Sequence, residues 1–264
     1  MTNKGFTLAE VLITLGVIGV VSALTLPTLI KNYQKKTWVE DLKVGVSILE
    51  QGFKKAMADD GVDDLKDTTL WNSCYDDGNS HNNPEYRTKC SAELNKYFKT
   101  AKIDFDSASG EISNAETCKN LVGKGNYWYI LNDKNKCFAS SNSNINIALA
   151  NGMLFEIYLI NDEPPGVGEI FALDINGNKG PNAFGRDAFS FVVISDGSVT
   201  TLYSETYVKA LDKIEKLQDF QFAIENIKRR RETECNASNK NNVGPWVGQA
   251  CSARVISEGW VMNY

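Results

Sequence analysis

The 264-residue sequence contains a single histidine, and none of its six cysteines belongs to a Cys-x-x-Cys pair. Zinc sites and thiol redox centres are built mainly from these residues, so the composition argues against both. There is also no glycine-rich phosphate loop, no dinucleotide fingerprint and no nucleophile motif in the chain. The sequence therefore predicts a protein that is not an enzyme.

An excess of basic charge is also missing. The chain has 28 Lys and Arg against 33 Asp and Glu, a net charge of −5. Proteins that bind nucleic acid neutralise phosphates with Lys and Arg, so nucleic acid is not a predicted partner. The one basic run, Lys228 to Arg231, closes a predicted helix, where cations stabilise the helix dipole. A solvated helix end is favoured there over contact with DNA.

The N-terminus holds a long apolar stretch, from Leu8 to Ile30, whose one charged residue is Glu10. A stretch of this length can cross a bilayer as a helix. A carboxylate in the middle of a membrane helix costs about 2.5–3.5 kcal/mol, so Glu10 is expected to have a partner. The residues before the stretch, Met1 to Gly5, are too few for an ordinary secretory signal.

Gly5 is followed by Phe6, with Glu10 four residues and Pro27 twenty-one residues after Phe6. This pattern resembles the processing site and stalk of type IV pilins and type II secretion pseudopilins. The resemblance implies that a prepilin peptidase cuts between Gly5 and Phe6 and methylates the Phe6 amine. It also implies that Glu10 is the assembly carboxylate, paired with the Phe6 amine of a neighbouring subunit. The alternative is a plain membrane anchor whose Glu10 reaches the headgroups.

Pro27 has two interpretations, because proline lacks an N–H and clashes with the preceding turn. It either kinks or loosens a continuous helix, or it marks the end of the helix. Gly16 and Gly19 add small side chains to the stretch, which permits close approach of another helix.

The resemblance also implies location, partners and function. The protein is expected in the inner membrane as a single-pass subunit, with its head outside the cytoplasm, and then in a pilus or pseudopilus. The expected partners are the prepilin peptidase/methyltransferase, other pilin or pseudopilin subunits, and the inner-membrane assembly platform. Two functions remain open: a structural subunit, or a minor pilin whose head binds DNA, a surface or secreted cargo.

All six cysteines follow the apolar stretch, and an even number there suits three disulfides in an oxidising compartment. Many pairings are open for six cysteines, and short loops favour the sequential one. The predicted pairs are Cys74–Cys90, Cys118–Cys137 and Cys235–Cys251.

Apolar residues recur at every third or fourth position beyond the stretch, which predicts an amphipathic helix packed on its own head. A helix from Phe6 to Asp59 would be about 80 Å long. Asn151-Gly152 and Asp196-Gly197 are strong hairpin signals between predicted strands. The apolar stripe comprises Trp38, Leu42, Val46, Leu49, Phe53 and Met57. The predicted strands are Tyr127–Leu131, Ile145–Ala150, Leu154–Ile160, Glu169–Asp174, Phe189–Ile194 and Val199–Tyr203, and further helices are expected over Ser91–Lys99 and Ser204–Arg231, the latter with room for a break at Phe220.

The expected fold class is α+β: a pilin-like fold in which the long N-terminal helix packs on an antiparallel sheet with disulfide-tied loops. The expected parts are a prepilin leader (1–5), a transmembrane and assembly helix (6–30), its amphipathic continuation (31–60), and a globular head (61–264) that ends in a helical and disulfide-bonded region.

One segment is a candidate calcium site. Oxygen-bearing side chains alternate with glycines there, and calcium takes six to eight oxygen ligands. Gly185 stands where an EF-hand would need its final glutamate, so the segment is not an EF-hand. The alternative is a turn-rich connector in which asparagine and glycine satisfy backbone geometry. The candidate ligands are Asp174, Asn176, Asn178, Asn182 and Asp187.

Overall fold

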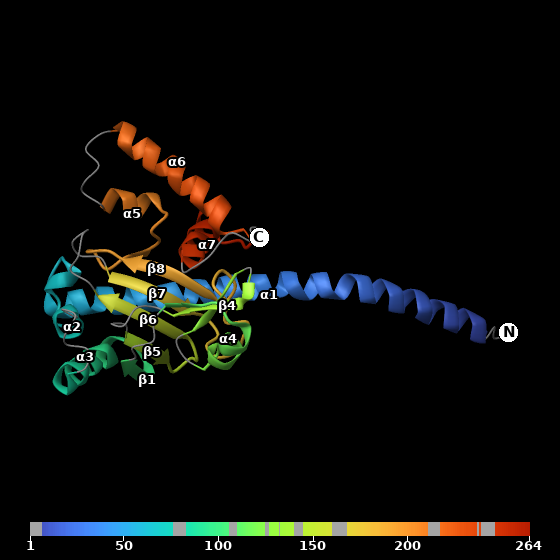
Figure 1. Ribbon diagram of the computed structural model, residues 1–264, viewed down its shortest axis with the longest axis horizontal. Helices are drawn as coiled ribbons and strands as arrows, with labels where there is room; N and C mark the ends of the chain where they lie inside the picture. Colours follow the sequence, from blue (N-terminus) through green and yellow to red (C-terminus); the bar gives the residue numbers. More distant parts are fainter. Residues whose placement is uncertain are drawn as a thin grey trace, which may run out of the picture.

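The computed structural model describes residues 7–75, 83–105, 110–124, 127–131, 133–139, 145–159, 168–210, 217–236, 238 and 246–264. One helix, α1 (Leu8–Asp60), extends far beyond a head built on an antiparallel sheet (Figure 1). The predicted α+β, pilin-like arrangement of a long apolar helix on an antiparallel sheet is confirmed.

The helix α1 has 53 residues, or about 80 Å at 1.5 Å per residue. It begins after Thr7 and ends at Gly61, which adopts the left-handed conformation with φ of 68°. Glycine takes this conformation without steric cost, and it lets the N–H of Val62 donate to the Met57 carbonyl at 3.1 Å. The predicted single helix is confirmed to within a residue or two of its expected ends.

Only the second half of α1 is buried, starting at Val39. The predicted apolar stripe is confirmed, since Leu42, Leu49 and Phe53 are at most 1% exposed. Close packing reaches the helix backbone at Gly52, where an added Cβ would lie 2.2 Å from Cε1 of Phe98. A larger residue at this position would have to displace a buried ring.

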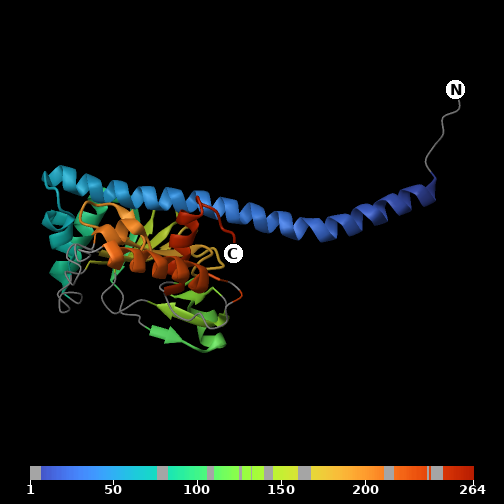
Figure 2. The ribbon, with the colours of Figure 1, turned by 90° about the horizontal axis from the view of Figure 1, so that it is seen from above.

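The main sheet has six antiparallel strands in the order β1-β5-β6-β7-β8-β9, and its face lies along α1 (Figures 1 and 2). Both predicted hairpin turns are confirmed, with positive φ at Gly152 and Gly197. The strands are β1 (Thr100–Phe105), β5 (Ile145–Leu149), β6 (Leu154–Leu159), β7 (Gly168–Asp174), β8 (Ala188–Val193) and β9 (Val199–Thr200).

A second, three-stranded sheet in the order β2-β4-β3 lies on the side of the head away from α1 (Figure 2). Of its strands, only β3 (Trp128–Ile130) was expected from the sequence. β4 (Asp133–Ala139) carries several polar residues, and β2 (Gly110–Ile112) has three residues, so neither shows the alternation that marks a strand. β1 does alternate polar and apolar residues, with Ile103 and Phe105 less exposed than Lys102 and Asp104, and the sequence analysis overlooked this signal.

The remaining helices correct several predicted boundaries. The helix expected from Ser91 begins earlier, because Asn83 caps it and Pro84 suits its first position. After Ser204 the structure describes two helices, and the second continues through Phe220, so the break considered there is wrong. A further helix forms in the C-terminal tail. These elements are α2 (Thr69–Cys74), α3 (Pro84–Tyr97), α4 (Ala115–Leu121), α5 (Glu205–Ala210), α6 (Leu217–Glu234) and α7 (Trp246–Ser257), with a 3-10 turn at Leu65–Asp67.

Three disulfides close the head with the predicted sequential pairing. Each joins elements that are close in the sequence: α2 to α3, α4 to β4, and the end of α6 to α7. The third pair holds α7 beside β8, where the Ser252 hydroxyl donates to the buried Ser190 carbonyl at 2.6 Å. The bonded pairs are Cys74–Cys90, Cys118–Cys137 and Cys235–Cys251.

Candidate functional site: the exposed half of the N-terminal helix

Glu10 lies in the first turn of α1, where it forms a capping box with Thr7. Its Oε2 accepts hydrogen bonds from the Thr7 backbone N–H and from the Thr7 hydroxyl, both at 2.8 Å. In return, the Glu10 N–H donates to the Thr7 hydroxyl oxygen at 3.3 Å. The sequence signal for this cap is a threonine three residues before a glutamate, which the sequence analysis did not use. Gly5 and Phe6, the expected cut and methylation site, lie outside the described residues.

The first half of α1 is apolar and has no cover from the head (Figure 2). Thirteen large apolar side chains between Leu8 and Ile30 are each 42% to 79% exposed. Keeping them in water would cost roughly 20–40 kcal/mol, at about 1.5–3 kcal/mol for each side chain. That exceeds the stability of most domains, so this half requires a bilayer or other protein around it. The helix is long and apolar enough to cross a membrane.

Gly16 and Gly19 lie on this uncovered half. A Cβ added at either position would meet nothing within 4 Å, so the fold of one chain gives no reason for glycine there. Small residues on one face of a helix let the backbone of a second helix approach closely, and positions three apart share a face. The two glycines therefore form a candidate contact for other helices.

Pro27 lies inside α1, and the helix continues through it. The interpretation in which the helix ends at Pro27 is therefore wrong. Proline has no N–H to donate to the carbonyl of Ala23, so one backbone hydrogen bond of the helix is missing. The exposed half of α1 is curved (Figure 2).

The candidate calcium ligands divide into two groups. Asp174, at the end of β7, is 1% exposed and accepts from the Trp128 indole N–H at 2.9 Å. Asp187, just before β8, is fully buried and accepts from two backbone N–H groups at 2.8 Å, those of Asn182 and Ala183. Burial and the charge of Asp187 raise the pKa of Asp174 to about 8.

Asn176 joins these two carboxylates, since its side chain donates to Asp187. Asn178 is exposed. Its backbone carbonyl and the side-chain nitrogen of Asn182 both lie close to Gly123. The Oδ1 atoms of Asn176 and Asn182 are buried without a hydrogen-bond partner. Such oxygens suit calcium, although no group of three or more His, Cys, Asp or Glu side chains comes together within the described ranges. Calcium binding stays a prediction, with Asp174, Asp187 and Asn176 as its central ligands.

A cavity of about 360 Å³ at the junction of the two halves of α1 was not foreseen. Lys31 and Lys35 line it from α1, and Arg186 lines it from the connection between β7 and β8. The only signal in the sequence is the group of lysines directly after the apolar stretch. Nothing in the sequence links those lysines to Arg186 or to Tyr264, which also lines the cavity.

Comparison with protein families places a known motif on this helix. A family model described as the prokaryotic N-terminal methylation motif matches residues 1–26. No curated protein and no solved structure matches the chain. The N-terminus is therefore a type IV pilin-like prepilin motif, and the head behind it has a pilin-like α+β fold. Together the motif and the uncovered apolar helix fit a membrane-anchored, prepilin-type subunit.

Proposed function

We propose that the chain is a structural subunit that polymerises through α1 into a type IV pilus or a type II secretion pseudopilus. A prepilin peptidase cuts between Gly5 and Phe6 and methylates the new amine on Phe6. The observation that carries the proposal is the uncovered apolar half of α1, directly behind a prepilin motif. A subunit of this kind needs binding partners and no catalytic residues.

Two environments cover this half in turn. Before assembly, lipid surrounds it in the inner membrane, with the disulfide-bonded head outside the cytoplasm. After assembly, the α1 helices of neighbouring subunits surround it, and Gly16 and Gly19 allow them to approach closely. The inner-membrane assembly platform moves the subunit from the first environment to the second.

Glu10 sets the register of assembly. In one chain its carboxylate is bound by its own Thr7. In the fibre it pairs with the methylated Phe6 amine of a neighbour, because a buried carboxylate without a cation is costly. A charge-assisted hydrogen bond is roughly twice as strong as a neutral one, so the register that matches the charges is preferred.

Gly5→Val tests the proposal at its first step. We expect the variant to stay in the membrane as an uncut precursor and to be missing from sheared fibres. Asn3→Ala, in the same leader, is the matched control and should be cut and assembled normally. Normal cleavage of Gly5→Val would show that the peptidase does not act at this position.

The amount of the chain in sheared fibres separates a main subunit from a minor one. A main structural subunit dominates the preparation, whereas a minor pilin that binds DNA, a surface or secreted cargo through its head is present at a few copies per fibre. The head of 204 residues after α1 is large for a repeating subunit, which favours the minor role as the second candidate.

A further inference from the structure

A mostly apolar groove lies along one flank of the buried half of α1. Its volume is about 440 Å³, whereas a cavity of about 150 Å³ is enough for a benzene ring, so the groove has room for more than one side chain. Lys99 is an exposed lining residue and forms no ion pair with any carboxylate in the described part of the chain. The other walls include Ile48, Gly52 and Lys55 of α1, Tyr97 of α3, and Leu149 and Ala150 of the hairpin between β5 and β6.

On another flank of α1, the chain turns sharply after α7 and exposes an apolar side chain. Gly259 and Trp260 both have positive φ, 77° and 65°, an unfavourable conformation for a residue as bulky as tryptophan. The Trp260 ring lies beside Lys43 of α1, whose Nζ is 5.9 Å from the ring centroid. Val261 follows and is 43% exposed, although the next residue, Met262, is buried. Gly259, Trp260 and Val261 form an apolar corner.

The groove and the corner lie on opposite sides of α1. Successive residues of an α-helix are about 100° apart, so Lys43, beside the corner, and Ile48, in the groove, lie about 140° apart around the axis. Figure 1 shows the same arrangement, with α7 on one side of α1 and α3 and β1 on the other. Two different patches that bind each other from copy to copy form a heterologous contact, which produces an open filament when the rotation does not close into a ring.

We propose that the groove of one subunit binds the corner of a second copy of this chain. This contact rests on the proposed function, because α1 helices that pack together in a fibre leave the two flanks of each head facing its neighbours. Binding would remove the Val261 side chain and the apolar walls of the groove from water.

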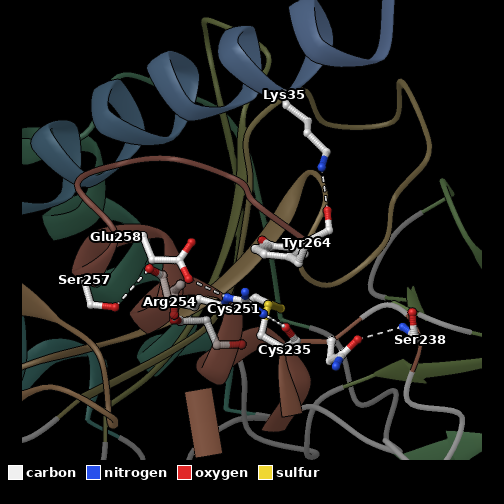
Figure 3. Close-up of a disulfide and its surroundings, with 11 residues drawn as sticks. Lys35, Cys235, Ser238, Cys251, Arg254, Ser257, Glu258 and Tyr264 are labelled. Carbon is white, nitrogen blue, oxygen red and sulfur yellow. Dashed lines mark hydrogen bonds and ion pairs between the residues drawn. A yellow bond between two sulfur atoms is a disulfide. The ribbon is translucent and has the colours of Figure 1, made fainter. Parts of the chain in front are cut away.

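The charges beside the two patches are complementary. Glu258 directly precedes the corner, so it would bring a carboxylate to the side of the groove that carries Lys99. Glu258 Oε1 accepts from the Arg254 Nε at 2.8 Å (Figure 3). A carboxylate has about four lone-pair sites, so it can accept from a lysine of a neighbour as well.

The contact defines how far the second copy is displaced along the fibre. The corner lies beside Lys43 and the groove is centred near Gln51, which is about 12 Å further along α1 at 1.5 Å per residue. The second copy is therefore displaced by about this distance toward the Asp60 end of α1. The pairing of its Phe6 amine with Glu10 requires a displacement in the same direction, because Phe6 precedes Glu10 in the chain. The two contacts are thus compatible in direction.

Paired cysteine substitutions test the contact in sheared fibres. Lys55→Cys places a thiol in the groove and Val261→Cys places one at the corner of the same chain, and a short bismaleimide links thiols that are close. All six native cysteines are in disulfides, so only the introduced thiols react. We expect a ladder of dimers, trimers and higher products, because each chain carries both sides of a heterologous contact. Neither single variant should give a covalent product.

Lys54→Cys combined with Val261→Cys is the matched control and should give no ladder. Lys54 is exposed and adjacent to Lys55, but it lies against Gly197 of the β8–β9 hairpin and does not line the groove. Unchanged melting temperatures would show that the variants fold.

Wild-type amounts of fibre without a ladder from Lys55→Cys with Val261→Cys would overturn the contact and leave the proposed function intact. An equal ladder from the Lys54→Cys control, dimers from Val261→Cys alone, or products only with a different pilin would also overturn it. If the unsubstituted chain is missing from fibres, the proposed function fails, and the contact between copies fails with it.

Discussion

The capping box at the start of α1 allows the two possible roles of Glu10 to be separated. Glutamine can replace glutamate in a capping box, so Glu10→Gln keeps the hydrogen bonds with Thr7 and removes only the charge. Thr7→Ala has the opposite effect, because it removes the hydroxyl that accepts from the Glu10 N–H and leaves the charge. The two variants therefore form a matched pair.

The expected magnitudes differ clearly. Loss of an N-cap side chain costs about 0.5–2 kcal/mol and affects only the first turn of the helix. Loss of one member of a buried ion pair costs about 3–5 kcal/mol, since the Phe6 amine of the neighbour stays buried and unpaired. A change of 3 kcal/mol weakens each subunit contact by roughly 100-fold. Glu10→Gln should therefore abolish assembly as fully as Glu10→Ala, while Thr7→Ala should still form fibres.

The assay has two readouts for each variant. Mass measurement of the membrane fraction reports cleavage, which should be normal in all three variants. Immunoblots of sheared fibres report assembly. Fibres from Glu10→Gln at the wild-type level would refute the pairing of charges and leave Glu10 with a capping role only.

Three further predictions concern the head. The folded chain keeps a proton on Asp174 that the unfolded chain releases, because its pKa is about 8 instead of its ordinary 3.8. The free energy of unfolding should therefore fall as the pH rises from about 4 to about 8. Denaturant titrations at several pH values should show that Asp174→Asn flattens this dependence. If the free energy of unfolding of Asp174→Asn falls as steeply with pH, another group is responsible. Millimolar calcium should raise the melting temperature through the same carboxylate and the unpartnered Asn176 Oδ1, and equal melts in calcium and in chelator would exclude the site. Replacing Cys235 and Cys251 by alanine should cost about 3 kcal/mol, as expected for a loop of this length, and an unchanged denaturation midpoint would show that α7 is held by packing alone.

The features that were predictable from the sequence depend on local patterns. The second half of α1 was predictable because apolar residues such as Leu42, Val46 and Leu49 recur every three or four positions and so lie on one face of the helix. The hairpins depend on two-residue signals, and the disulfide pairing on short loops, so all three are contained in short stretches of sequence. The processing motif is likewise local, and a family model matches it.

The features that were missed depend on contacts between distant residues. β1 is an exception, because its alternation of polar and apolar residues was a local strand signal that went unused before its pairing with β5 was known. The helix α7 depends on its packing against β8, through contacts such as that of Ser252 with Ser190. The cavity lined by Lys35 needs the fold to bring Arg186 beside this lysine, which lies 151 positions earlier in the chain. Spacing in the sequence carries no information about these contacts.

Mass spectrometry of the N-terminal peptide of the chain recovered from sheared fibres tests the central claim most directly. The account predicts a peptide that begins at Phe6 and carries one N-methyl group, with no trace of Met1 to Gly5. A chain in the fibres that still begins with its leader, or a processed chain that occurs only in the membrane fraction of piliated cells, would contradict it.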